Sequence, residues 1–446
     1  MALTAVEIYK FLPKTNCGDC GVATCLAFAM KLAQKQAALD ECPHVTDDAK
    51  QALEDSAAPP MATVTLGMGD HQLKIGGETV LFRHDETFHN PCGLAVTIDT
   101  SLPDEQIQQR VEKLQEARYD RVGFILGVDL IALQDAGDGR LAEAARLATQ
   151  HSDLPLVLMS TDPAAVKQAL EVCGDGRPLI YGATADNLDA MLPLAKEHNC
   201  PLVLSADSLE NLVPLSESAT KAGGDQLLLD TGAQRIGDIQ SDQTVIRRMA
   251  LNKKFKPLSF PTVVACSAAD PAQQMLQACS AIAKYAGVVI VDLISDEYLL
   301  PLVTARMNIY TDPQKPIQVE PGIYPVGEAD EDSPVLATVN FSLTYYLVEG
   351  DVMTSKVPAH ILAVDTNGTS VLTAWAAGDL TAEVIAEHIQ RFDLADKVSH
   401  KTLVLPGGVA VLQGKLEEES GWQIKVGPKE SSALAQFFRE QGWVAK

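Results

Sequence analysis

The sequence predicts an α/β protein of three parts: a small cysteine-rich module, a central (β/α)8 (TIM) barrel and a small C-terminal α/β domain. Three observations predict this organisation. Four cysteines lie close to the N-terminus, apolar strand-like segments alternate with amphipathic stretches between about 93 and 310, and a second βα alternation follows a proline-rich segment. A chain of 446 residues is long enough for two to four domains with buried cores.

Composition limits the possible partners and compartment. Acidic residues number 59 against 35 basic ones, so the formal net charge is −24. Such a surface repels phosphate backbones, and the chain has no run rich in Lys and Arg, so nucleic acid is not expected as a partner. The N-terminus lacks the layout of a signal peptide, and no apolar run approaches the roughly 20 residues that span a bilayer. We therefore expect a cytoplasmic protein without a membrane partner.

Four of the nine cysteines form a distinct pattern. Cys17, Cys20, Cys25 and Cys42 follow the spacing C-x2-C-x4-C-x16-C, with Pro43 directly after the last. Cytoplasmic thiols stay reduced, so this pattern favours metal or cluster binding over disulfides. Four thiolates with a terminal Cys-Pro suit a 4Fe–4S cluster. A structural zinc site is the alternative, although zinc sites usually pair two short CxxC motifs.

The rest of this module is expected to be largely helical. Residues 25–42 are rich in Ala, Leu, Lys and Gln, which predicts one helix whose length brings Cys42 back as the fourth ligand. A short helix and a linker are expected over 44–60. The other cysteines stand singly, mostly beside apolar runs, and are expected to be small buried hydrophobes: Cys92, Cys173, Cys200, Cys266 and Cys279.

The central part predicts a hairpin and then eight β/α units. The hairpin is expected from 71–77 and 78–84. Each later strand candidate is followed by an amphipathic stretch, and the count and length match a (β/α)8 barrel. An open doubly wound sheet is the alternative, because periodicity does not show closure. The strand candidates are 93–99, 121–127, 154–160, 178–183, 201–206, 226–232, 261–267 and 287–293.

The segment 311–333 is proline-rich and acidic and predicts a hinge-like linker. The domain from Pro334 onward is expected to move as a unit and to bind ligands at the carboxyl ends of its strands. Its expected strands are 335–340, 360–365 and 401–408, and its expected helices are 342–354, 380–392, 407–419 and 431–441. The predicted domains are 1–58, 59–310 and 334–446, with 311–333 as the linker.

The combination of C-x2-C-x4-C-x16-C-P, barrel and small α/β tail resembles the large (gamma) subunit of the corrinoid/iron–sulfur protein of the acetyl-CoA (Wood–Ljungdahl) pathway. The resemblance covers essentially the whole chain, and the cysteine pattern is its most specific element. It implies that Cys17, Cys20, Cys25 and Cys42 hold a 4Fe–4S cluster and that the tail is a Rossmann-like corrinoid-binding domain. It also implies a corrinoid cradle, formed by Asn340, Thr344, Tyr346, Ser370, Val371, Leu372, Thr373, Gly407, Gly408 and Ala433.

The function that this resemblance implies is methyl transfer by a carrier subunit in carbon dioxide fixation. The corrinoid would take a methyl group from methyltetrahydrofolate through a methyltransferase and deliver it to acetyl-CoA synthase, while the cluster returns Co(II) to Co(I). The implied partners are a small subunit, forming a heterodimer, the methyltetrahydrofolate methyltransferase and acetyl-CoA synthase/CO dehydrogenase. No side chain is assigned a catalytic role.

The tail histidines agree with this resemblance. None of them lies in the Asp-x-His-x-x-Gly context that supplies a lower cobalt ligand in many cobalamin domains, so no protein histidine is expected on cobalt. We interpret His388 and His400 as helix-surface and loop residues. Two other functions stay open: an iron–sulfur electron-transfer subunit without corrinoid, or a barrel methyltransferase that binds the pterin with the strand-end residues Asp99, Asp129, Asp207 and Asp230.

Overall fold

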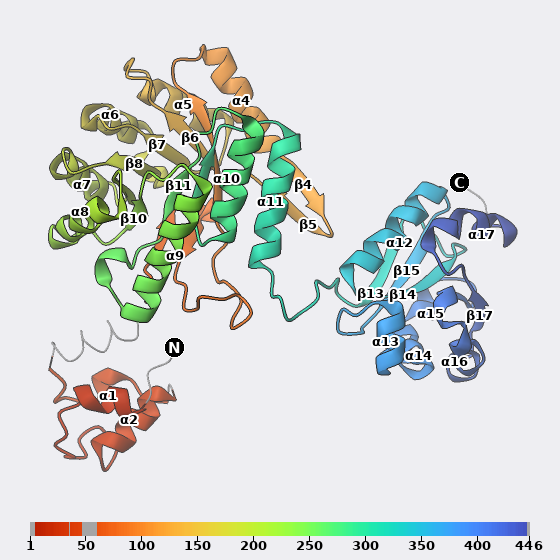
Figure 1. Ribbon diagram of the computed structural model, residues 1–446. Coiled ribbons are helices and arrows are strands. Elements are labelled where there is room, and N and C mark those ends of the chain that lie inside the picture. Colours follow the sequence, from red (N-terminus) through yellow and green to blue (C-terminus); the bar gives the residue numbers. More distant parts are fainter. Residues whose placement is uncertain (1–4, 35, 47–59, 444–446) are drawn as a thin grey trace. The chain divides into compact units, whose positions relative to one another are not determined.

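The computed structural model describes residues 5–34, 36–46 and 60–443 (Figure 1). The chain divides into two compact units, one made of Met1–Arg118 and Leu126–Tyr310 and the other of Tyr119–Ile125 and Thr311–Lys446. Most of the short helix and linker expected over 44–60 lies outside the described residues. Among the residues that are described, no helix is long and apolar enough to cross a membrane.

The N-terminal module is a pair of short helices around a small core. Its elements are α1 (Ala5–Phe11), α2 (Cys25–Ala33) and the 3-10 helix η1 (Leu39–Glu41). The single helix expected over 25–42 is wrong: α2 ends at Ala33, and the chain turns back so that Ala37 and Leu39 pack on the same core as Phe28. The side-chain hydroxyl of Thr24 accepts a hydrogen bond from the Ala27 amide at 3.1 Å and caps the start of α2.

Eight parallel strands form the barrel, in the order β10-β9-β8-β7-β6-β3-β12-β11. The two ends of this order meet: Leu229 pairs with Thr262, and the Leu229 amide donates to the Pro261 carbonyl at 2.9 Å. This pairing closes the sheet and excludes the open doubly wound alternative. The strands are β3 (Gly93–Asp99), β6 (Leu130–Gln134), β7 (Leu156–Met159), β8 (Leu179–Ala183), β9 (Leu202–Ser205), β10 (Leu227–Asp230), β11 (Val263–Ala265) and β12 (Val288–Val291).

The second barrel strand differs from the expected one. Residues 121–127 were expected to enter the barrel, but they belong to a hairpin of β4 (Arg118–Arg121) and β5 (Phe124–Gly127). Val122 and Gly123 between them have φ values of 53° and 82°, which suit a tight hairpin turn and not a continuous strand. Phe124 and Ile125 are exposed, whereas β6 is buried over its first four residues and takes the barrel position instead.

A hairpin precedes the barrel, but its two strands are not the ones that the sequence predicted. β2 (Leu73–Gly76) pairs with the upstream β1 (Thr63–Leu66), with the short η2 (Gly69–His71) between them, and 78–84 forms no strand. Val64, Leu66 and Ile75 pack into the same core as the inward side chains of the barrel strands. The hairpin therefore contributes to the barrel core.

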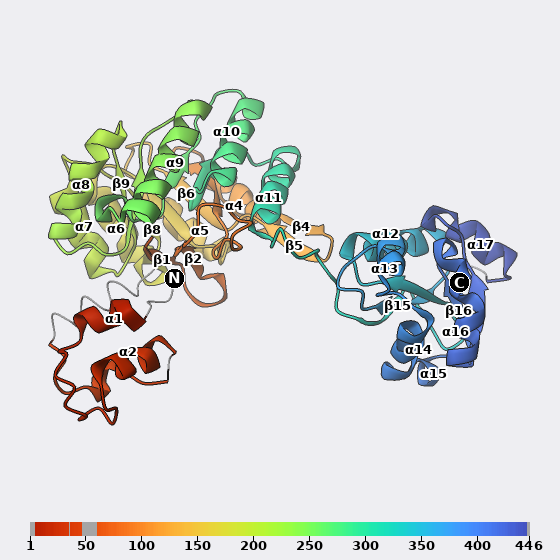
Figure 2. The same cartoon turned by 60° about the horizontal axis from the view of Figure 1, so that its bottom comes forward.

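Helices surround the barrel in both views (Figure 1 and Figure 2). Two of them start with an aspartate cap followed by proline: Asp162 accepts from the Ala164 amide and Asp270 from the Ala272 amide, both at 2.9 Å. The helices are α4 (Asp104–Glu116), α5 (Leu141–His151), α6 (Pro163–Cys173), α7 (Leu188–Glu197), α8 (Leu209–Lys221), α9 (Ile236–Lys253), α10 (Pro271–Ala283) and α11 (Asp296–Tyr310), with 3-10 turns η3 (Gly174–Gly176) and η4 (Lys256–Leu258).

The tail is a five-stranded sheet in the order β13-β15-β14-β16-β17, parallel except for β13. Its strands are β13 (Gly322–Val326), β14 (Val335–Val339), β15 (Ala359–Val364), β16 (Thr402–Leu405) and β17 (Gln423–Val426). Its helices are α12 (Ser342–Ser355), α13 (Val371–Ala377), α14 (Ala382–Arg391), α15 (Leu394–Lys397), α16 (Gln413–Ser420) and α17 (Leu434–Glu440), with η5 (Gly407–Leu412) and η6 (Ser431–Ala433). One core packs α13, α14 and α16 on one face of the sheet, and a second packs α12 and α17 on the other.

The linker expected over 311–333 is partly wrong. Its residues 322–326 form β13, which pairs antiparallel with β15 along its whole length. Pro325 is tolerated because β13 is an edge strand, where one side of the backbone needs no partner. The second compact unit includes all residues from Thr311 onward, and β13 is part of its sheet, so the stretch 320–334 is not the hinge that its composition suggested.

Candidate cofactor sites

The four clustered cysteines lie in one small module. Cys25 and Cys42 are buried in its core, and Cys20 is half-buried and packs against them, whereas Cys17 is exposed. Cys25 starts α2, and its amide donates to the Asn16 side-chain carbonyl at 2.8 Å. The structure thus groups three of the expected ligands around one core.

Two glycines shape the loop that carries the first three cysteines. Gly18 and Gly21 have φ values of 83° and 74°, in the left-handed region that favours glycine. The Gly21 amide donates to the Gly18 carbonyl at 2.9 Å, which closes a tight turn around Cys20. A loop folded this tightly can direct neighbouring thiols toward a common centre.

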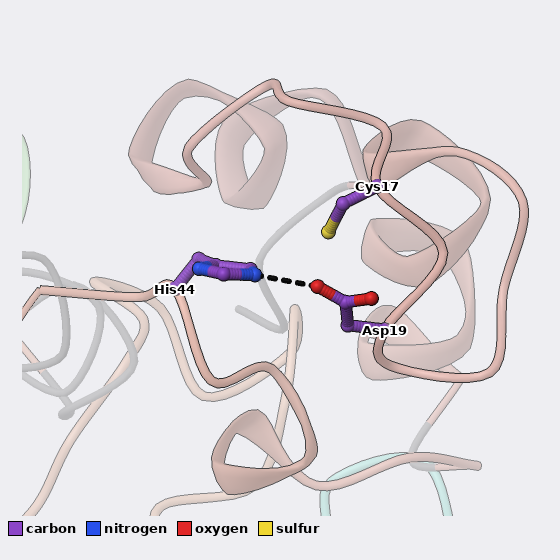
Figure 3. Close-up of side chains that lie close together, drawn as sticks. All are labelled: Cys17, Asp19 and His44. Atoms are coloured by element: carbon purple, nitrogen blue, oxygen red, sulfur yellow. Dashed lines mark hydrogen bonds and ion pairs between the residues drawn. The ribbon is translucent and has the colours of Figure 1, made fainter.

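Cys17 has two polar neighbours that the sequence analysis did not consider (Figure 3). The Asp19 carboxylate lies 2.6 Å from His44 Nε2, and Cys17 Sγ lies within 4.8 Å of the ligand atoms of both. The hydrogen bond from His44, followed by one from Cys17, lowers the pKa of Asp19. Because His44 comes two residues after Cys42, this contact brings the fourth cysteine's segment next to the first cysteine's loop.

The chemistry of the module fits an iron–sulfur cluster. All nine cysteines of the chain are free thiols, and four of them lie in this module of about 40 residues. Soft thiolates are the ligands that iron–sulfur clusters and zinc prefer. The remaining cysteines are different, because burial raises the pKa of Cys92, Cys173, Cys200, Cys266 and Cys279. The prediction that these are buried hydrophobes is confirmed for the first four, and Cys279 is half-buried.

The tail carries a cavity of about 220 Å³ beside the carboxyl ends of β16 and β17. Thr344 and Val371, both expected in the cradle, line it. Its other lining residues are mostly apolar: Leu336, Ala337, Thr338, Leu347, Val348, Val404, Leu405, Pro406, Gly427, Pro428, Lys429, Glu430, Ser431 and Leu434. An apolar cavity with a few polar groups at its rim is the usual form of a small-molecule site.

Gly407 and Gly408, directly after the lining residue Pro406, have different surroundings. A Cβ at Gly407 would lie 2.5 Å from the Gly427 carbonyl oxygen and 2.8 Å from the Pro428 carbonyl carbon, both rigid backbone atoms. A Cβ at Gly408 would meet only the flexible end of Leu372, at 3.1 Å. Position 407 therefore requires glycine for the close approach of two loops, whereas position 408 has some freedom.

Comparison with family models and with curated relatives places the chain in a family. Residues 63–438 match the family described as CO dehydrogenase/acetyl-CoA synthase delta subunit, and residues 12–44 match a family described as a putative Fe-S cluster. The chain is 45% identical to the corrinoid/iron-sulfur protein large subunit of Moorella thermoacetica, over 98% of this chain and 99% of that protein. This chain belongs to the family of corrinoid/iron–sulfur protein large subunits.

Archaeal members of this family are also similar over almost their whole length. One is the gamma subunit of the acetyl-CoA decarbonylase/synthase complex from Methanothermobacter thermautotrophicus, which is 37% identical to this chain over 98% of each protein. The gamma subunit from Methanopyrus kandleri is 38% identical, over 99% of this chain and 98% of its own. Among solved structures, dihydropteroate synthase from Vibrio fischeri ES114 covers 50% of this chain and 95% of its own, at 14% identity and a TM-score of 0.38. This structural similarity is too low to support an argument, so the barrel is assigned from the strand pairing described above.

The other residues expected in the cradle of this large subunit do not all line the cavity. Asn340 is completely buried, and its side chain is used in hydrogen bonds within the tail. Tyr346 packs edge-to-face on Tyr345, with ring centroids 5.1 Å apart, and is not among the lining residues. The hydroxyls of Ser370 and Thr373 lie 3.0 Å apart at the start of α13, next to Val371.

The last helix reaches the cavity through neighbours of Ala433. Ser431 and Leu434 line the cavity, whereas Ala433 itself does not. Sequence reasoning missed the segment 427–431 because it did not predict β17, the strand that delivers it. The available signal was the short alternating stretch 423–426 followed by Gly-Pro.

The tail histidines of this large subunit are engaged within the chain. His388 was interpreted as a surface residue, but it is only 5% exposed. Its Nδ1 donates to the Val384 carbonyl at 2.8 Å, and its Nε2 accepts from the Asp365 amide at 3.1 Å. His400 likewise uses both nitrogens, with the Ser333 carbonyl at 3.0 Å and the Thr402 amide at 3.1 Å.

The barrel carboxylates do not form one site. Asp129 lies before β6, at the amino end of the strand, where it pairs with Arg306 and accepts from the Leu94 amide at 2.8 Å. Its expected place at a carboxyl end is therefore wrong. Asp230 at the end of β10 accepts from the Tyr181 hydroxyl at 2.5 Å, and burial raises its pKa. Local hydrogen bonds from Ser101 and Asn211 lower the pKa of the other two, Asp99 and Asp207.

Proposed function

We propose that this large subunit is a methyl carrier whose tail binds a corrinoid and whose N-terminal module holds a 4Fe–4S cluster on Cys17, Cys20, Cys25 and Cys42. The observation that carries the tail assignment is the apolar cavity at the carboxyl ends of β16 and β17, where ligands bind in doubly covered α/β sheets. When bound, the corrinoid would accept a methyl group from methyltetrahydrofolate through a separate methyltransferase and deliver it to acetyl-CoA synthase, and the cluster would return oxidised cobalt to Co(I).

The tail residues act by binding and shaping. Thr344 and Val371 line the cavity and would contact the corrinoid directly, while Ser370 and Thr373 fix the start of the helix that presents Val371. Gly407 lets the β16 and β17 loops approach closely, which sets the width of the cavity at that edge. Asn340 holds the neighbouring loop through its side-chain hydrogen bonds. No side chain is proposed to form or break a bond in the methyl transfer. The reaction class is corrinoid-dependent methyl transfer with this chain as the carrier.

Each part of the chain has its own task in this proposal. We assign the cluster to residues 1–58 and the barrel to 59–310, and we place the corrinoid domain in the second compact unit, within Thr311–Lys446. The relatives are named as a large subunit and as subunits of a complex. We therefore propose a heterodimer with the small subunit of the corrinoid/iron–sulfur protein, and encounters with the methyltetrahydrofolate methyltransferase and acetyl-CoA synthase/CO dehydrogenase.

The decisive experiment for the corrinoid site compares two adjacent glycine substitutions. Gly407→Ala forces a methyl group against rigid backbone, so we expect at least a tenfold loss of bound corrinoid, read from the visible spectrum of the anaerobically purified heterodimer. Gly408→Ala meets only the movable end of Leu372 and should retain near-normal corrinoid. Equal corrinoid in the two variants would contradict the placement of the corrinoid at this cavity.

The cluster is tested on the same preparations by iron analysis. Cys20→Ala should lose most of the four irons expected per chain and leave the corrinoid bound. Cys173→Ala is the matched control, since that thiol is buried in the barrel unit and should not change the iron content. A Cys20→Ala protein that keeps four irons would make the ligand assignment wrong.

A further inference from the structure

The loop that carries Cys17 and Cys20 also carries a carboxylate. Asp19 stands between these cysteines, and its carboxylate lies 2.6 Å from His44 Nε2, which belongs to the segment after Cys42 (Figure 3). Cys17 Sγ lies within 4.8 Å of the ligand atoms of both Asp19 and His44. A negative charge is thus held close to one expected cluster ligand by a residue 25 positions away in sequence.

Stability does not account for this contact. The side chains of His44 and Asp19 are 46% and 53% exposed, and even a fully charged pair in such surroundings would contribute little to folding. The loop around Asp19 has a defined backbone, since Gly18 has a φ of 83° and the Asn16 side chain accepts from the Cys25 amide, and His44 contacts the carboxylate itself. The contact therefore fixes where a charge lies relative to sulfur.

We propose that Asp19 lowers the reduction potential of the cluster and that His44 is the positioning residue that holds its carboxylate beside Cys17. This inference rests on the proposed function, because it assumes a cluster on the four cysteines. One-electron reduction adds a negative charge to a cluster already bound by four thiolates, and a carboxylate a few ångströms away disfavours that added charge. Net charge, hydrogen bonds to sulfur and solvent exposure are the properties by which proteins set cluster potentials.

The direction of this effect matches the task proposed for the cluster. A reductant that returns cobalt to Co(I) must have a low potential, so a charge that destabilises the reduced cluster increases its driving force. Because the carboxylate is half exposed, water screens it and the effect should be moderate. We expect about a tenfold change in the ratio of reduced to oxidised cluster at a fixed solution potential, which is about 59 mV for a one-electron couple.

The test is a redox titration of the intact heterodimer, followed by the electron paramagnetic resonance signal of the reduced cluster. Asp19→Asn keeps the shape and a hydrogen-bonding group but removes the charge, so the potential should rise by about that amount with the iron content unchanged. His44→Gln releases the carboxylate and should shift the potential in the same direction by less. Once the charge is gone the histidine has nothing to position, so the double variant should match Asp19→Asn alone.

Glu41→Gln is the matched control in the same module. Glu41 precedes Cys42, but its carboxylate accepts from the Ala38 amide at 2.8 Å and is thereby directed at backbone. The same change of charge should therefore move the potential less than Asp19→Asn does. An Asp19→Asn potential that moves no more than that of Glu41→Gln would overturn the inference. So would loss of iron from Asp19→Asn alone, because Asp19 would then be a structural residue.

The two proposals fail in different ways. If the unmodified protein lacks four irons per chain and the reduced-cluster signal, the proposed function is wrong. If the cluster is intact and the Asp19→Asn potential does not move, the inference on Asp19 alone is wrong.

Discussion

At the scale of single residues, Asn340 serves the cavity without lining it. Its side-chain oxygen accepts from the Thr366 amide at 2.9 Å and the Gly368 amide at 3.1 Å. Its side-chain nitrogen donates to Gln318 at 3.1 Å and Asp365 at 3.2 Å. One buried amide thus fixes the loop that leads from β15 to α13, the helix that carries Val371.

Replacing Asn340 by Ala should destabilise the tail by about 2 to 3 kcal/mol, because several buried backbone groups lose their partner at once. Tryptophan fluorescence during denaturation reads this selectively, since the three tryptophans, Trp375, Trp422 and Trp443, all lie in the tail. Thr354→Ala, which removes an exposed hydroxyl on α12, is the control and should cost less than about 0.5 kcal/mol. Equal midpoints for the two variants would contradict the bracing role of Asn340.

The site residues show what sequence can and cannot supply. The four cysteines could be proposed as cluster ligands because their spacing suggests one centre, and the structure brings Cys20, Cys25 and Cys42 to one core while Cys17 is exposed. Tyr346, expected in the cradle, does not line the cavity because residues on a helix are separated by about 100°: Thr344, Leu347 and Val348 share the cavity face, and Tyr346 lies off it. His388 was taken for a surface residue because the hydrogen bond that its Nε2 accepts from the Asp365 amide forms only when the loop after β15 packs on α14.

At the scale of elements, long apolar runs were predictable and short or interrupted ones were not. Seven barrel strands matched their segments, because buried parallel strands read as continuous Val, Ile and Leu. The second was misassigned because 121–127 and 130–134 are both apolar, and only the turn at Val122 and Gly123 separates a hairpin from a barrel strand. β13 was missed because its proline and glycine resemble a linker.

The role of β13 gives a prediction at this scale. Val326 is 4% exposed and packs in the core under α12, so Val326→Asp would bury an unpaired carboxylate and lower the denaturation midpoint of the tail. Lys315→Ala, in the exposed stretch before the strand, is the control and should leave that midpoint unchanged. If 311–333 were a linker throughout, tryptophan fluorescence would show no difference between the two variants.

At the scale of the whole molecule, several exposed apolar side chains of the tail lie on α12, α13 and η5, and one of them, Leu347, lines the cavity. Leu343 and Leu347 are 53% and 58% exposed and lie one turn apart on α12, so they share a face. Leu372 and Trp375, 58% and 44% exposed, share a face of α13, and Val411 is 72% exposed on η5. Leu372 lies near Gly408, since a Cβ added there would be 3.1 Å from the end of the Leu372 side chain. Exposed apolar patches of this kind mark interaction surfaces.

In the proposed heterodimer the small subunit covers these exposed apolar side chains, which we call the rim. It also covers the exposed side of the corrinoid. The double variant Leu347→Ser and Leu372→Ser removes two apolar groups from that surface, and each loss of about 1.4 kcal/mol weakens binding tenfold. We therefore expect the Kd for the small subunit to rise by about a hundredfold and the corrinoid to be lost on gel filtration. Leu276→Ser on α10 is the control, because Leu276 is similarly exposed, at 53%, but belongs to the barrel unit. A double variant that binds the small subunit as tightly as Leu276→Ser would show that the partner does not use this rim, and the corrinoid would then need another cover.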